Sequence, residues 1–171
     1  MVIVSVAAEN VGFEDHLGRI GLAEADVPVI CLEPIAFPVL GLTGPQRGRD
    51  FEWGNLLTPV RFLLPGHPLS GHRADLAQLP VSFSWARPVG EALRIATLVD
   101  HPDRAALFAY DAGKQMLEGK APARRVGLLL DPQIVERPDA GSWSLFEAAV
   151  NWCVEPIVGQ HSAGGISAPK R

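Results

Sequence analysis

The clearest pattern of hydrophobic and polar positions lies near the end of the chain. Residues Arg125 to Leu130 form an almost unbroken apolar run, which is typical of a strand covered on both faces. After a polar stretch, residues Gly141 to Trp152 repeat apolar side chains at intervals of three and four, the period of a helix. One stripe of this helix is apolar, and we expect it to face the sheet: Trp143, Phe146, Val150 and Cys153. A strand that leads into a helix packed back on it predicts an α/β fold.

The same reading predicts short strands and one further helix upstream. Three apolar runs predict buried strands: Val2–Val6, Val27–Leu32 and Pro59–Leu64. Apolar residues at helical period predict a helix over Gly12–Ala25, and a segment rich in Gly and charge predicts a loop over residues 41–55. Later runs predict three shorter strands: Val81–Trp85, Arg94–Leu98 and Ala105–Tyr110.

Length and charge narrow the class of protein. The chain has 171 residues, enough for one domain with its own core, which we assign to residues 1–154. Residues 155–171 hold Gly, Ser, Ala and Pro with few large apolar side chains, which predicts a disordered tail or linker stump. The net charge is −4, so the composition predicts no nucleic-acid partner.

Neither a membrane segment nor a signal peptide is predicted. No apolar run approaches the ~18 residues of a membrane span, and no cationic and apolar leader with a cleavage site stands at the N-terminus. The residues leave the localisation open.

Cysteine and histidine usage predicts neither disulfides nor a metal site. The two cysteines, Cys31 and Cys153, lie in apolar segments, where each is expected to be a small buried side chain. The five histidines have no paired ligand spacing, and nothing in the chain predicts a cofactor.

Four segments together carry a resemblance to a known family. The segments are the strand Val2–Ser5, the strand and turn Val27–Pro34, the turn His67-Pro68-Leu69-Ser70-Gly71 and the segment Arg124–Trp152. Their order and spacing resemble those of a ThuA-like (trehalose-utilisation) domain. This family is a branch of the class I glutamine amidotransferase-like superfamily. The resemblance spans about residues 2–154.

The resemblance implies a flavodoxin-like α/β fold, with a mostly parallel sheet flanked by helices. The opening strand–helix–strand unit of the family has no counterpart here, so we expect an N-terminally truncated domain. The family tends to have a His after the closing strand, where this chain has Leu130-Asp131-Pro132. Such modules also occur inside larger bacterial extracellular proteins without a catalytic set, which is compatible with an exported parent protein. The family itself implies a carbohydrate context.

Three polar residues are candidates for ligand contacts. Glu33 ends a predicted parallel strand, and ligands of open α/β sheets bind outside such ends. His67 lies in a tight turn, and Asp131 ends the last predicted strand. The alternatives are structural: Glu33 as a capping carboxylate, and His67 and Asp131 as turn residues.

Two further residues invite a functional reading that the pattern does not favour. The superfamily's glutaminases use a cysteine nucleophile on a strand-to-helix elbow, which makes Cys31 a candidate, but Cys31 lies inside the strand pattern and no His-x-Glu follows it. Trp53 could stack on sugars or pin its loop to the core, and pinning is the commoner use of such a residue.

The sequence therefore predicts a non-catalytic module that binds a small molecule, a carbohydrate or another domain. The alternative is a sugar-metabolism enzyme or hydrolase that uses Glu33, His67 and Asp131, which requires these side chains to converge. The uncharged Val2–Val6 strand would become a sheet edge in a truncated domain. Such an edge predicts self-association or a partner segment that supplies a strand.

Overall fold

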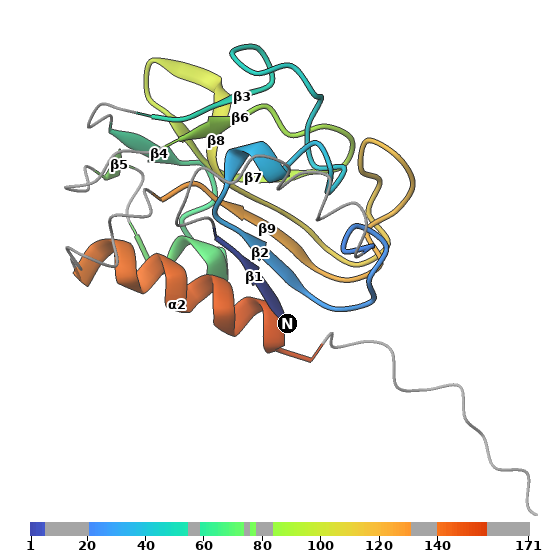
Figure 1. The fold of residues 1–171 in the computed structure, drawn as a ribbon. Coiled ribbons are helices and arrows are strands. Elements are labelled where there is room, and N and C mark those ends of the chain that lie inside the picture. Colours follow the sequence, from blue (N-terminus) through green and yellow to red (C-terminus); the bar gives the residue numbers. More distant parts are fainter. Residues whose placement is uncertain (6–20, 55–58, 74–75, 78–83, 131–139, 157–171) are drawn as a thin grey trace, which may run out of the picture.

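One mixed, curled β-sheet carries the fold of this computed structural model (Figure 1). The structure describes residues 1–5, 21–54, 59–73, 76–77, 84–130 and 140–156. The strands are β1 (Val2–Val4), β2 (Val29–Cys31), β3 (Phe51–Glu52), β4 (Val60–Phe62), β5 (Leu76–Ala77), β6 (Trp85–Ala86), β7 (Leu93–Leu98), β8 (His101–Tyr110) and β9 (Arg125–Leu128). Two 3-10 turns, η1 (Pro34–Ala36) and η2 (Pro68–Ser70), and the helix α2 (Ala140–Val154) complete the described elements.

The sheet is parallel at one side and antiparallel through the rest. Its order is β1-β2-β9-β8-β7-β4-β5, and the short β6 pairs with both β3 and β8. Only β1, β2 and β9 run parallel among the described strands, with Ile3, Ile30 and Val126 in register. From β8 onward every described pairing is antiparallel.

The expected flavodoxin-like fold is therefore wrong. The described residues form a mostly β structure with one α-helix, rather than a mostly parallel sheet flanked by helices. The physical reason is the length of the connections. Leu98 pairs with His101, so only two residues join β7 to β8, whereas a parallel connection needs about a dozen residues or more. A continuous apolar run is typical of a parallel strand. β8 has such a run because it is covered on both faces, although its neighbours are antiparallel.

Two hydrophobic layers cover the two faces of the sheet. On one face α2 and η2 pack over side chains that include Ile30, Val126 and Leu128. On the other face the chain around η1 packs over Cys31, Phe108 and Leu129 with no described α-helix. The second face is therefore covered by a folded loop where the α/β expectation placed a helix.

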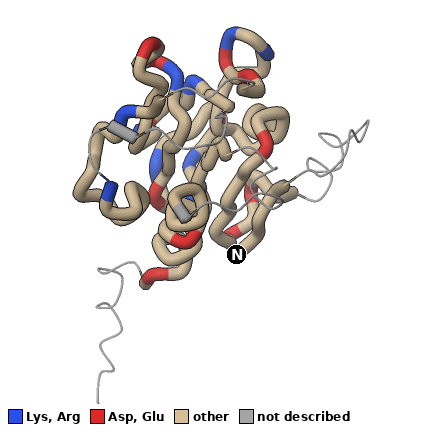
Figure 2. The backbone as a smooth tube through the Cα atoms, turned by 90° about the vertical axis from the view of Figure 1, so that its left-hand side faces the viewer, with Lys and Arg blue, Asp and Glu red and all other residues tan. Residues whose placement is uncertain are grey.

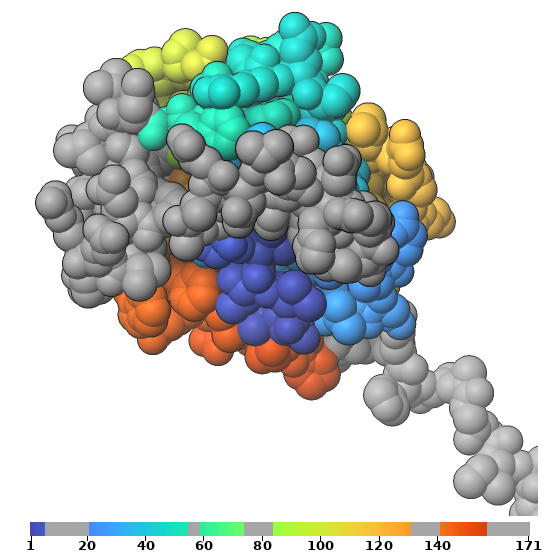
Figure 3. All heavy atoms as spheres, viewed as in Figure 1, coloured from blue at the N-terminus to red at the C-terminus, as the bar shows by residue number. Residues whose placement is uncertain are grey.

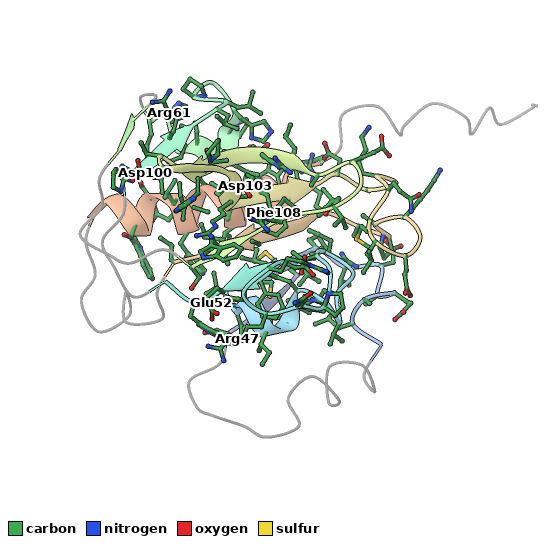
Figure 4. The ribbon with its side chains drawn as sticks, turned by 90° about the horizontal axis from the view of Figure 1, so that it is seen from above. Arg47, Glu52, Arg61, Asp100, Asp103 and Phe108 are labelled. Atoms are coloured by element: carbon green, nitrogen blue, oxygen red, sulfur yellow. The ribbon has the colours of Figure 1, made fainter. Side chains whose placement is uncertain are left out.

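The parallel and antiparallel parts meet where Phe108 of β8 faces Gly127 of β9. A Cβ atom on Gly127 would lie 2.3 Å from the Phe108 ring, so only glycine leaves room for this contact. The ring of Phe108 is fully buried and meets Phe37 edge-on at 5.5 Å between centroids (Figure 4). This contact anchors the loop layer to the junction of the sheet.

Buried side-chain donors fix the loops that cross the sheet ends. The Arg125 guanidinium donates to the carbonyl oxygens of Val27 and Ala25, each at 2.7 Å, and it is fully buried. The Tyr110 hydroxyl lies 2.7 Å from the carbonyl oxygen of Val89 and 2.9 Å from that of Leu42. These bonds satisfy backbone carbonyls that no strand or helix pairs in this part of the chain.

The helix α2 exists as expected, but it is rotated relative to the predicted stripe. Its buried side chains are Ser142, Leu145, Ala149, Trp152 and Cys153. Trp143 is 45% exposed, and Phe146 and Val150 lie at the margin of the core. Of the four predicted inward residues, only Cys153 is fully packed.

The other local expectations have mixed outcomes. Strands form at six of the predicted runs; β1, β2, β4 and β9 are shorter than predicted, whereas β7 and β8 extend beyond the predicted runs. The predicted helix over residues 12–25 falls mostly outside the described residues, and residues 21–24 form a turn. The predicted strand Val81–Trp85 also falls mostly outside them, as does the tail from residue 157.

Gly127→Ala tests the junction between the two parts of the sheet. Because the added methyl group would overlap a fully buried ring, we expect a loss of about 1–3 kcal/mol in the free energy of unfolding. Gly66→Ala is the matched control, since a Cβ there meets nothing within 4 Å and should change stability by less than about 0.5 kcal/mol. Urea denaturation measures both, and equal effects would contradict the assigned contact.

Candidate functional site

Glu33 follows the end of β2, as the sequence predicted, and its carboxylate is tied to the protein. The side chain is buried, and its Oε1 accepts a hydrogen bond from Trp53 Nε1 at 2.9 Å. Burial raises the pKa of Glu33 above its usual value, and the bond from Trp53 opposes this rise. Its environment is that of a structural anchor for the loop that carries Trp53.

Trp53 is held on several sides by its own loop. The Arg47 guanidinium lies 4.5 Å from the ring centroid, and Phe51 meets the ring edge-on. Arg47 in turn pairs with Glu52 at 2.8 Å, at the outer end of this loop (Figure 4). Arg47 therefore occupies a ring face that a stacked sugar would need, and Trp53 pins its loop as the sequence favoured.

The two cysteines are poor nucleophiles. Cys31 is fully buried in β2, and burial raises its pKa far above that of a free thiol. Burial also raises the pKa of Cys153, to about 11. Neither thiol forms the exposed, electropositive site that a reactive cysteine needs.

His67 caps η2, where the sequence placed a turn. Its Nδ1 accepts a hydrogen bond from the Leu69 amide at 3.2 Å, so this nitrogen serves the backbone. Partial burial lowers the pKa of His67, and the nearby Arg124 lowers it further while Asp111 acts in the opposite direction. The ring lies 6.1 Å from that of Trp152, near the C-terminal end of α2.

The structure separates Glu33 from His67. Glu33 lies at the C-terminal ends of the parallel strands, within the loop layer. His67 lies on the α2 face, beside Trp152, whose ring is covered by Arg124 at the N-terminal end of β9. Asp131 lies outside the described residues. Two of the three candidate residues therefore do not share a site.

The described residues show neither a metal-ligand cluster nor a hollow at the candidate residues. Among the described residues, no three His, Cys, Asp or Glu side chains gather as metal ligands do. Three surface hollows of about 380, 380 and 440 Å³ are lined by neither Glu33 nor His67. Within the same described ranges, no helix has the length and apolar character that crossing a membrane requires.

A different feature stands out at the free edge of the sheet. In the described structure no strand pairs with the outer side of β1. Val2 N–H donates to Pro28 and the Val4 carbonyl accepts from Leu32, so both residues bond toward β2. Because backbone direction alternates along a strand, the N–H and C=O of Ile3 between them point outward. The Ile3 side chain is 43% exposed.

One flank of α2 continues this edge as an apolar surface. At 100° per residue, Phe146, Val150, Trp143 and Val154 all fall between the buried stripe and the solvent side of the helix. The opposite flank packs against η2, where Arg73 bonds Ser144. Trp143 and Phe146 stack at 5.5 Å between centroids, and Val154 is 60% exposed. Figure 3 shows β1, in dark blue, and α2, in orange, side by side at the surface.

We call this surface the β1 face, and it comprises Met1, Ile3, Trp143, Phe146, Val150 and Val154. The sequence pattern predicted the edge strand and the helix stripe separately, but it placed the stripe against the sheet. The missed signal was a second apolar series on the helix, Leu145, Ala149 and Trp152, which competes for the sheet. No charged residue lies in β1 (Figure 2).

No family model, curated protein or solved structure matches this chain. The resemblance to ThuA-like domains therefore stays a prediction, and the flavodoxin-like architecture that it implied is wrong for the described residues.

Glu33→Gln tests the buried carboxylate through its pH dependence. A carboxyl group whose pKa is raised by folding binds more protons in the native state, so it destabilises the fold as pH rises above its ordinary value of 4.5. The Gln amide keeps an oxygen for Trp53 but does not ionise. We expect the free energy of unfolding of the variant, relative to wild type, to increase from pH 4 to pH 7. Urea titrations followed by tryptophan fluorescence at the two pH values measure it, and a pH-independent difference would contradict the raised pKa.

Proposed function

We propose that this domain is a non-catalytic interaction module that binds another polypeptide through the β1 face. The observation that carries the proposal is the joining of an unpaired strand edge with an uncharged apolar helix flank in the described structure. An open edge offers main-chain hydrogen bonds to an added strand, and the flank offers apolar area beside it.

The energetic case rests on exposed apolar area. Ile3, Trp143 and Val154 are exposed by 43%, 45% and 60%. Removing such side chains from water stabilises a complex by roughly 25 cal/mol for each Å² of apolar surface buried. A stacked Trp–Phe pair is also the kind of rigid aromatic group that dominates binding energy at interfaces.

The polar candidate residues support a non-catalytic role, because their side chains make structural hydrogen bonds. Glu33 bonds Trp53, and His67 Nδ1 accepts from the backbone of its own turn. An enzyme built on these residues would require them to meet at one substrate, and they lie on opposite faces of the sheet. The carbohydrate context implied by the family resemblance gains no support from Trp53, because Arg47 covers one face of its ring.

Site-specific photocrosslinking tests the proposal even when the partner has not been identified. A benzophenone amino acid replaces Trp143 in one variant and Leu117 in a control, since both side chains are about equally exposed at 45% and 44%. In cells that make the protein, we expect a discrete covalent adduct from position 143 and not from position 117. No adduct from position 143, or the same adducts from both positions, would contradict binding through the β1 face.

A further inference from the structure

We propose that the partner of the β1 face is a second copy of this chain, joined by antiparallel pairing of the two β1 strands about Ile3. The inference rests on the proposed function and names its partner. It adds a symmetry axis, a register and a set of contacts that the proposed function leaves open.

The first argument is the hydrogen-bonding pattern of the edge. Ile3 is the central residue of β1, and its N–H and C=O point away from β2. In an antiparallel pair, two directly opposed residues can exchange both of their N–H···O=C bonds. A twofold axis through Ile3 therefore lets each copy satisfy the outward groups of the other, as an isologous interface requires.

The second argument is the register between the strand and the helix flank. Ile3 is level with Val126 through the parallel ladder, and Arg124, two residues before Val126, covers the ring of Trp152. Two strand residues span about 6.6 Å, which corresponds to about four residues of helix. The level of Ile3 therefore falls near residue 148, midway between Phe146 and Val150.

This register makes the helix flank self-complementary. A twofold axis at Ile3 reverses the direction of the second helix and keeps its midpoint at the same level. Phe146 of one copy then faces Val150 of the other across the axis, and Trp143 faces Val154. A flank centred elsewhere along the helix would leave one end of each apolar series without a counterpart.

The third argument is charge. The chain carries a net charge of −4, so two copies repel each other over most of their surface. The six side chains of the β1 face are all uncharged, so an isologous contact there opposes no like charges among these side chains. A partner selected by charge complementarity would instead need ionic groups on this face.

The gap between the two α2 helices at the twofold axis is wide enough for the Trp143 and Phe146 rings. The helix α2 packs over β2 and β9, so paired β1 strands would place the two helix axes about 15–20 Å apart at ~4.8 Å per strand. This separation exceeds the roughly 8–10 Å of directly packed helices. The stacked Trp143 and Phe146 rings of each copy have the bulk to fill the space above the two Ile3 side chains.

Sedimentation equilibrium on the full chain tests the pairing. Between about 1 and 100 μM we expect the mass to rise from the 18.4 kDa of the chain toward twice that value. Ile3→Glu and Val154→Glu should each raise the dissociation constant at least ~10-fold. Leu117→Glu, at a similarly exposed site off the β1 face, should leave it unchanged. Circular dichroism melts verify that each variant is folded, and Val154, the most exposed of these residues, is the change least expected to disturb folding.

A disulfide at the axis gives an independent readout. Opposed residues of a hydrogen-bonded antiparallel pair have Cα atoms about 5.5 Å apart, within the range that a disulfide spans. Ile3→Cys should therefore form a covalent dimer under mild oxidation, and Leu117→Cys should not. The native cysteines do not interfere, because both are buried.

The outcomes separate the two proposals. A wild-type chain that stays monomeric, or a dimer that resists both glutamate changes, overturns the twofold pairing. If position 143 then crosslinks to a different protein, the interaction module stands and only the identity of its partner changes. If position 143 gives no adduct at all, both proposals fail.

Discussion

The close approach of the Phe108 ring to Gly127 is the constraint on which the rest of the structure depends. It lies where three parallel strands meet an antiparallel sheet, so it fixes how β8 sits against β9. The same ring meets Phe37 edge-on and so holds the loop layer against the sheet. A side chain at position 127 would push β8 away from β9 and the loop layer away from the sheet, because protein interiors have little free volume.

The loop layer is stabilised by a hydrophobic core that includes Phe37, Leu40 and Leu42, and by polar bonds to the backbone. Arg125 and Tyr110 donate to carbonyls of loops that lie far from them in sequence, and Glu33 accepts from Trp53. Each of these bonds satisfies a buried polar group that would otherwise cost about 1–3 kcal/mol. Glu33 and His67, two polar side chains that looked available for chemistry, thus hold loops, which supports the binding role that we propose.

The asymmetric covering of the sheet explains where binding is expected. One flank of α2 is packed by η2, whereas its other flank and the outer side of β1 have no described neighbour. An uncharged edge strand is ordinarily blunted by charge, proline or a covering element, and β1 carries neither charge nor proline. We therefore propose that a partner covers this surface, and the twofold complementarity about Ile3 is the reason for proposing a second copy.

The sequence by itself determined where the strands of the central sheet and the closing helix lie. It did so because long apolar runs and helical periods have few alternative local structures, as in β2, β9 and α2. It also placed His67 in a turn and Cys31 in a buried strand. The predicted strands Arg94–Leu98 and Ala105–Tyr110 were separated by only six residues, too few for a parallel connection, but the apolar runs and the family resemblance led to a parallel sheet.

Only the tertiary structure decided strand direction, the rotation of α2 and the partners of the polar residues. The helix offers two apolar series, and the sheet can bury only one of them, so packing chose Leu145, Ala149 and Trp152 and left Trp143 exposed. Glu33 meets Trp53 across twenty positions of sequence, a contact that no local pattern encodes. Such choices depend on which surfaces meet in space, and that is set by the whole fold rather than by any one segment.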